Sequence, residues 1–152
     1  MDSYRRRLRV EGSALAACGA AATAAVLAVG PGATDGPAST AGQLLAVAVL
    51  MATFGARSVR RALAGAEVGE GGTGEPTPIW QHAVAVAGLT LAFGFGAGWD
   101  AGLRVGGGCV IVGLAQALLF ERMVAREERR RGRSFHRIPG SSLFTGTRLG
   151  VR

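Results

Sequence analysis

The chain has 152 residues, of which 18% are charged, 49% are hydrophobic and 25 are glycine, and its formal net charge is +7. This composition disfavours an ordinary water-soluble domain, in which about a quarter of the residues are charged. The glycines follow no period of three, which excludes collagen, and the hydrophobic content disfavours wholesale disorder. The apolar residues fall in long intervals without Asp, Glu or Arg, and this distribution indicates a membrane protein.

The first apolar interval follows a basic N-terminus, residues 1–11, and predicts a membrane-spanning helix over residues 12–30. Pro31 and its flanking glycines are expected to end this helix. Because alanine dominates it, this span is the least apolar of the chain and depends most on its neighbours. The basic start and modest apolar run also resemble a signal peptide, and cleavage would remove one span without changing the orientation of the others.

Three further intervals predict helices of membrane-spanning length. Proline residues delay the start of two of them, which gives spans at 39–56, 79–98 and 102–120. Trp80 and Trp99 would lie about 28 Å apart along the third span, so they mark the two membrane interfaces. None of the predicted helices has a charged face, and a helical bundle in water is therefore disfavoured.

The positions of the arginines predict the orientation in the membrane. All 17 basic residues are arginine, and every one except Arg104 lies in residues 1–11, in the Gly- and Glu-containing loop 57–78 or in the tail 121–152. Four spans place these segments on one side, and the positive-inside rule makes that side the cytoplasm. We expect a multi-pass protein of the bacterial inner membrane with both termini in the cytoplasm.

Small residues predict how the helices pack. Lipid tails are as apolar as leucine, so helices in a membrane associate through close van der Waals contact, which small side chains permit. Gly94 and Gly98 form one GxxxG pair, and Gly102 and Gly106 form another. We interpret the pairs as sites of close helix packing within the domain 12–120.

The sequence offers little catalytic chemistry. It contains no recognisable catalytic, nucleotide-binding or metal-binding motif, so we predict no enzyme, no cofactor and no metal. The one polar cluster that hairpin geometry brings together is His82, Gln116 and Glu121, at the cytoplasmic interface. We interpret it as interfacial polar residues, with a pH-titrating switch as the alternative. Asp100 and Arg104 are spaced to form an ion pair at the other interface, or Arg104 reaches the headgroups.

The tail begins as a continuation of the last span. The sequence FERMVAREERRRGR predicts a cytoplasmic helix to about Gly132, in which Glu127 can pair with Arg131. Residues 134–152 mix basic and apolar side chains, and their conformation is not predicted. The arginines expected to contact anionic headgroups are Arg5, Arg6, Arg7, Arg122, Arg126 and Arg130.

The expected fold is all-α, with four transmembrane helices in an antiparallel bundle and an Arg-rich cytoplasmic tail. We expect a non-enzymatic accessory or scaffold subunit that acts through helix packing and this tail. Its partners would be anionic lipid headgroups and, as a homo- or hetero-oligomer, other membrane proteins, whereas nucleic acid is disfavoured. The alternative is an oligomeric channel or small-solute transporter, and a membrane enzyme acting on lipid ranks below it.

Overall fold

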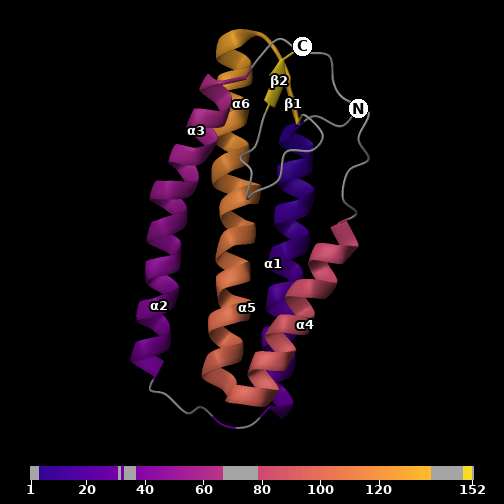
Figure 1. Cartoon of the computed structure of the whole chain (residues 1–152), viewed down its shortest axis with the longest axis vertical. Coiled ribbons are helices and arrows are strands. Elements are labelled where there is room, and N and C mark those ends of the chain that lie inside the picture. Colours follow the sequence, from indigo (N-terminus) through magenta and orange to yellow (C-terminus); the bar gives the residue numbers. More distant parts are fainter. Residues whose placement is uncertain (1–3, 31, 33–36, 67–78, 138–148, 152) are drawn as a thin grey trace.

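Within the residues that it describes, a computed structural model of the chain contains helices and two short strands (Figure 1). Three of its helices are long and apolar enough to cross a membrane: Tyr4–Val29, Ala38–Ala64 and Trp99–Arg131. The described apolar part of a further helix, Val84–Ala97, is shorter. The predicted all-α class with long apolar helices is therefore confirmed. The structure describes residues 4–30, 32, 37–66, 79–137 and 149–151.

Two of the long helices contain a π-helical segment. The elements in chain order are α1 (Tyr4–Val29), α2 (Pro37–Leu50), η1 (Met51–Gly55), α3 (Ala56–Ala64), α4 (Ile79–Ala97), α5 (Trp99–Leu114), η2 (Ala115–Phe120), α6 (Glu121–Arg131), β1 (Phe135–Arg137) and β2 (Leu149–Val151). The segments α2, η1 and α3 form one continuous helix, and α5, η2 and α6 form another. The two strands pair antiparallel, with His136 opposite Gly150.

Helix α1 begins at Tyr4, well before the span predicted to start at residue 12. The additional residues include several arginines, which are good helix formers, and Tyr4 and Leu8 are buried against other elements. The basic N-terminus is thus the first part of a helix from Tyr4 onward rather than a separate segment. Along the rest of its length, α1 contacts α4 and α5, and α2 contacts α5 from another side.

The turn between α4 and α5 consists of a single glycine. Gly98 has a φ of 98°, which L side chains rarely adopt, and α5 starts at the next residue. Its carbonyl oxygen accepts hydrogen bonds from the N–H groups of Ala101 and Gly102, at 3.1 and 3.2 Å. The indole N–H of Trp99 donates to the carbonyl oxygen of Gly30 over 2.8 Å, so the end of α1 is tied to this turn.

Helices α1 and α5 touch through glycines. A Cβ atom placed on Gly12 would lie 2.6 Å from the carbonyl oxygen of Gly113, and one placed on Gly19 would lie 2.8 Å from that of Gly106. On each helix the two glycines are one heptad apart, the repeat that keeps a contact seam on one face of a gently supercoiled pair. The backbones therefore approach at two successive levels, more closely than any side chain would allow.

Large apolar side chains point away from the helix contacts. Among them, Leu45, Phe54 and Val84 are more than half exposed, at 66%, 61% and 62%. They come from α2, η1 and α4, so the outward apolar surface is spread over several helices. An all-round apolar exterior of this kind is typical of helices surrounded by hydrocarbon.

A small apolar core lies at one end of the helices. It joins side chains from the start of α1, from α3, from η2 and α6, and from both strands: Tyr4, Leu8, Leu63, Phe120, Val124, Phe135 and Leu149. Phe135 and Leu149 are each only 1% exposed. The tail, whose conformation could not be predicted from the sequence, thus places at least these two apolar residues inside the chain's own core.

The two π-helical segments lie at the base of this core. Gly55, the last residue of η1, faces the ring of Phe120, the last residue of η2, and a Cβ on Gly55 would lie 2.5 Å from its Cζ atom. π-helical turns are rare, occur mostly as single turns inside α-helices, and are frequent at functional sites. Both long helices change here from an apolar segment to an arginine-rich one.

Candidate functional site: an arginine-covered head

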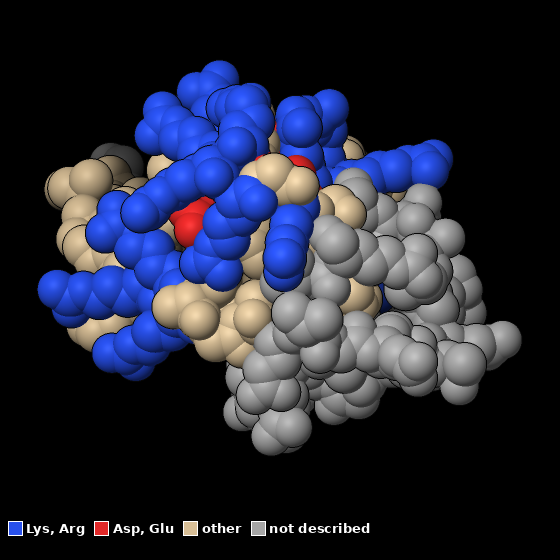
Figure 2. Space-filling model, turned by 90° about the horizontal axis from the view of Figure 1, so that it is seen from above, with Lys and Arg blue, Asp and Glu red and all other residues tan. Residues whose placement is uncertain are grey.

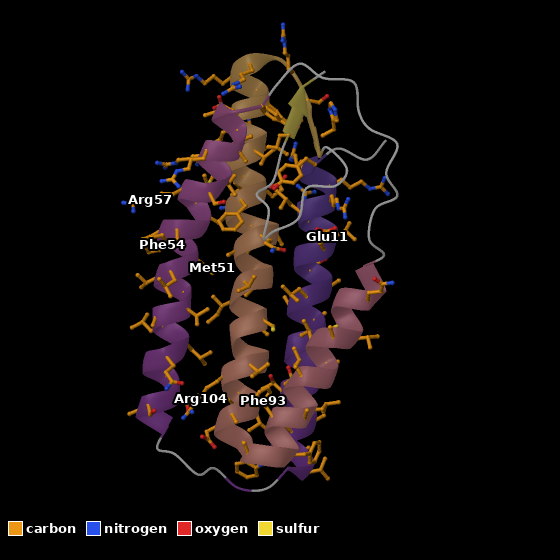
Figure 3. All side chains as sticks on the ribbon, in the orientation of Figure 1. Glu11, Met51, Phe54, Arg57, Phe93 and Arg104 are labelled. Atoms are coloured by element: carbon orange, nitrogen blue, oxygen red, sulfur yellow. The ribbon has the colours of Figure 1, made fainter. Side chains whose placement is uncertain are left out.

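Charged residues gather at the end of the molecule that holds the small apolar core. We call this end the head and define it by the described residues 4–11, 56–66, 121–137 and 149–151. Every described arginine except Arg104 lies in the head, and arginine side chains cover much of the described surface seen from above (Figure 2). Glu11 and Arg57 lie toward this end, whereas Arg104 lies toward the opposite one (Figure 3).

Glu121, the first residue of α6, is the most deeply buried carboxylate of the head, at 5% exposure. It accepts hydrogen bonds from two arginines of α1, Arg5 and Arg9, the latter over 2.8 Å. The hydrogen bond from Arg5 is the main cause that lowers the pKa of Glu121, and the bond from Arg9 adds to it. Glu121 therefore stays ionised and ties the start of α1 to the start of α6.

The other carboxylates of the described head are also engaged. Glu11 pairs with Arg7 one turn earlier in α1. Glu127 pairs with Arg131 at 2.6 Å, the pair predicted from the sequence, and lies 3.9 Å from Arg130. Glu128 accepts a hydrogen bond from the backbone N–H of Phe135 over 3.1 Å, which fixes the start of β1 against α6.

Several arginines remain without a carboxylate. Within the described residues, no ion pair or hydrogen bond involves the side chain of Arg122, Arg126, Arg129 or Arg133, and each of the four is exposed. The guanidinium of Arg57 lies 5.8 Å from the centre of the Phe54 ring, a cation–π distance. The head thus has more positive charge than its own carboxylates compensate.

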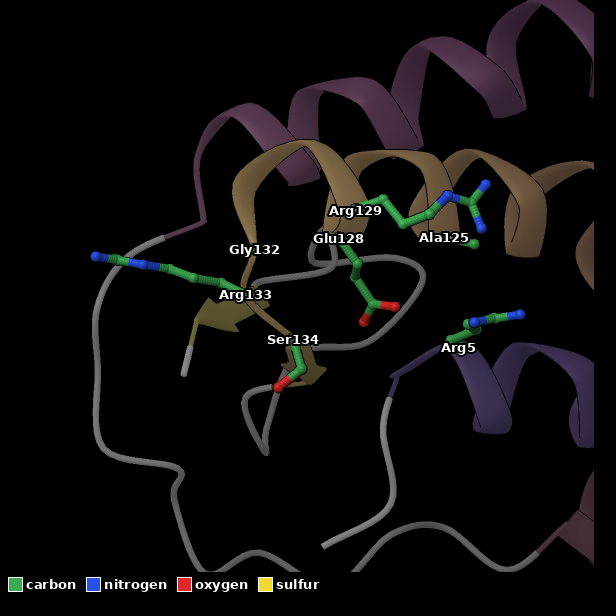
Figure 4. A pocket seen from close by; sticks show the side chains of 7 residues that line it. All are labelled: Arg5, Ala125, Glu128, Arg129, Gly132, Arg133 and Ser134. Carbon is green, nitrogen blue, oxygen red and sulfur yellow. The ribbon is translucent and has the colours of Figure 1, made fainter.

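A shallow pocket of about 270 Å³ opens between the start of α1 and the end of α6. It is lined by Arg5, Ala125, Glu128, Arg129, Gly132, Arg133 and Ser134 (Figure 4). The Glu128 side chain points into the space between the helices, whereas Arg133 extends away from it. With three arginines and one carboxylate, which already accepts an N–H bond, the lining is positively charged overall.

The predicted polar cluster falls only partly within the described structure. The side chain of His82 lies outside the described residues. Gln116 is half-buried in η2, and its Cβ would lie 3.0 Å from a Cβ on Gly12. Glu121 is held by Arg5 and Arg9, partners that the sequence did not suggest because they come from the other end of the chain.

The glycines singled out in the sequence are all buried. Gly94 and Gly102 lie against Val26 of α1, and Gly106 lies against Thr23 and Gly19. Gly98 is the turn residue between α4 and α5. Sequence reasoning missed Gly12, Gly19 and Gly113, although their seven-residue spacing was a signal that could have found them.

Of the arginines predicted to contact lipid, Arg5 and Arg7 are bound to carboxylates, and the other four are exposed: Arg6, Arg122, Arg126 and Arg130. At the opposite end of the molecule, Asp100 and Arg104 form the predicted pair, with an N–O distance of 3.2 Å. His136 of β1 is 6% exposed, and both of its ring nitrogens lack a hydrogen-bond partner within the described structure.

Comparison of this chain with models of known protein families, with curated proteins and with solved structures yields no match.

Proposed function

We propose that this chain is a four-span protein of the bacterial inner membrane, with both termini in the cytoplasm, and that it serves as a non-enzymatic scaffold. In this proposal the four apolar helices form an antiparallel bundle that anchors the head, and the head binds anionic groups. The observation that most supports this proposal is the position of the positive charge, because the described arginines other than Arg104 all lie in the head, at one end of the molecule. Positively charged flanks of apolar helices are retained in the cytoplasm, which supports this orientation.

The lengths of the helices support the position of the membrane. From Trp99 to Phe120 a helix rises about 32 Å, close to the ~30 Å thickness of the hydrocarbon. Trp99 suits the outer interface, where indole rings are favoured. On the inner side, Gly55 and Phe120 are in contact, and the first charged residues after them are Arg57 and Glu121. We place the inner boundary at this level.

The orientation is tested by labelling single cysteines with a membrane-impermeant maleimide. Cys18 and Cys109 are first replaced by alanine, and one cysteine is introduced at Ser134 in the head or at Gly32 beyond α1, both of which are exposed. We expect the Ser134→Cys variant to react only in inverted vesicles and the Gly32→Cys variant only in right-side-out vesicles. The reverse pattern would overturn the orientation.

The scaffold role is tested by purification in a mild detergent. We expect the full chain to be an oligomer or to retain a specific partner, and we expect the Glu121→Gln variant, which loosens the head, to reduce that association. A monomer without a partner, unchanged by the substitution, would contradict the proposal.

The channel alternative needs a path between copies of the chain. Within one copy, Gly94 and Gly106, the glycines expected to line a path, are in close contact with Val26 and Thr23. Solute flux in liposomes that is abolished by bulky substitution at Gly94 or Gly106 would favour the channel over the scaffold.

A further inference from the structure

We infer that the exposed arginines of α6 and Arg133 just beyond it form two tiers, apart from Arg131, which pairs with Glu127. We infer further that only the lower tier serves the membrane and that the upper tier binds an acidic segment of a second protein. The lower tier is Arg122 and Arg126, and the upper tier is Arg129, Arg130 and Arg133. This inference rests on the proposed function, because it uses the inner membrane boundary placed at Phe120. It deepens that function by naming the chemistry of the partner.

The height of the upper tier above the membrane is the first argument. Helix α6 has 11 residues, so it rises about 16 Å beyond the boundary if it stands upright, and about 15 Å at a typical tilt. The headgroup layer on one side of a bilayer is only about 5–8 Å thick. Arg129 and Arg130 lie in the last turn of α6, so their backbone stands well above this layer, with Arg133 beyond the helix end.

The side chains of both tiers lean in the same direction, so their height decides which arginines reach the lipid. In a helix, Cα–Cβ bonds tilt toward the N-terminus, which for α6 is the membrane side. Arg122 and Arg126 can therefore reach back to the phosphates. The Cα atoms of Arg129 and Arg130 lie roughly 13–15 Å above Phe120, about 5–10 Å beyond the headgroup layer, a distance comparable to the physiological screening length of about 8 Å.

The uncompensated charge of the upper tier is the second argument. The side chain of Arg130 is 82% exposed and lies 3.9 Å from Glu127, which pairs more closely with Arg131. Arg129 and Arg133 have no carboxylate partner within the described residues. Arg129 and Arg130 each lie one turn from Arg126, and like charges at this spacing destabilise a helix, an effect that an external partner of opposite charge would relieve.

The head favours a carboxylate-bearing partner over a nucleic acid. Proteins that bind single strands without sequence preference combine basic grooves with exposed aromatic rings. Tyr4, Phe120 and Phe135 are the aromatic side chains of the small core, and they are 8%, 7% and 1% exposed. A guanidinium binds a carboxylate through two parallel hydrogen bonds, and the pocket lined by Arg129 and Arg133 has room for an acidic side chain.

The experiment uses the full chain in nanodiscs of pure phosphatidylcholine, which removes anionic lipid. The probe is a fluorescent helical peptide with glutamate at every fourth position, and its control carries glutamine instead. We expect the glutamate peptide to bind, and we expect combined Arg129→Gln, Arg130→Gln and Arg133→Gln substitution to weaken binding by about tenfold. Combined Arg122→Gln and Arg126→Gln substitution should change this affinity by less than about threefold.

A second measurement tests whether the lower tier, and not the upper tier, binds anionic lipid. Added phosphatidylglycerol should raise the melting temperature of the wild type and of the upper-tier variant, and should raise that of the lower-tier variant less. An unchanged melting temperature in phosphatidylcholine shows that each variant folds, which is expected because the replaced side chains are exposed. If the two variants lose peptide affinity equally, and also lose the rise in melting temperature equally, the division into two tiers is wrong.

Two other outcomes would overturn the inference. One is wild-type affinity of the upper-tier variant for the peptide, and the other is tighter binding of an oligonucleotide of equal charge through the same arginines. Cysteine labelling distinguishes this failure from failure of the proposed function. Labelling of Ser134→Cys only from outside would refute the orientation, whatever the peptide does in nanodiscs.

Discussion

Replacement of Gly113 by alanine should destabilise the contact between α1 and α5. The added Cβ would lie 2.5 Å from the carbonyl oxygen of Gly12 and 2.6 Å from the backbone nitrogen of Ala16. Both atoms belong to the backbone of α1, so neither can rotate away as the tip of a side chain could. Ordinary contact begins at 3.4 Å, so the helices must separate locally by about 1 Å.

The expected cost follows from this overlap. Forcing an extra methyl group into a well-packed contact typically costs about 1–3 kcal/mol. Separation also removes close van der Waals contact at Gly12 and Gly19, and such contact is what holds helices together in a membrane. The higher helix propensity of alanine offsets up to about 1 kcal/mol of this cost. We therefore expect the free energy of unfolding to fall by about 1–2 kcal/mol.

The matched control is Gly108→Ala in the same helix. A Cβ at Gly108 would meet nothing within 4 Å, so only the gain in helix propensity applies there. Unfolding of both variants by titration with a denaturing detergent in mixed micelles gives the comparison. Equal stability of Gly113→Ala and Gly108→Ala would refute the conclusion that backbone contact between α1 and α5 sets the stability of the helices.

Two further substitutions probe the head. Since its arginine partners lower the pKa of Glu121, its ion pairs stabilise the fold above the ordinary glutamate pKa, and this contribution is lost as the pH falls through the lowered value. The wild type should therefore lose stability in acid below about pH 4.5. The Glu121→Gln variant should be less stable than the wild type at about pH 7 and should lack this acid loss. Parallel curves of stability against pH for the two proteins would contradict the stabilising role of the Glu121 ion pairs. Gly132 ends α6 with a φ of 63°, and a Cβ placed on it would have no neighbour within 4 Å. Gly132→Ala should therefore lower the free energy of unfolding by about 1–2 kcal/mol through backbone strain alone. Gly132→Asn should be less destabilising than Gly132→Ala when both are compared by thermal melting. An alanine variant as stable as the wild type would refute this strain.

Much of the helical pattern could be predicted from the sequence, because it depends on local signals. Uninterrupted apolar intervals correspond to long helices, and the glycine after the last arginine run ends α6 at Arg131. The pairs Asp100–Arg104 and Glu127–Arg131 also follow from one-turn spacing along a single helix. Each of these features needs only the geometry of one helix.

The features that were missed need the relative placement of distant segments. Glu121 meets Arg5 and Arg9 only because α1 and the α5–α6 helix lie at a particular register, which composition does not encode. The burial of Phe135 and Leu149 likewise depends on a pairing between strands that are separated along the chain. The glycines at 12, 19, 106 and 113 encode part of that register, as a heptad repeat shared by two helices.

The paired π-helical segments constrain how the length of this protein can change. A π turn holds one residue more than an α turn, so it rotates everything beyond it by about 100° relative to an uninterrupted helix. Because η1 and η2 meet at Gly55 and Phe120, directly below the head core, each extra residue helps to set which face of α3 and of α6 is turned toward that core. Loss of one residue from only one of these helices would turn its half of the head away from the other. The number of residues in each helix up to this level is therefore as much a part of the head's design as the side chains of its core.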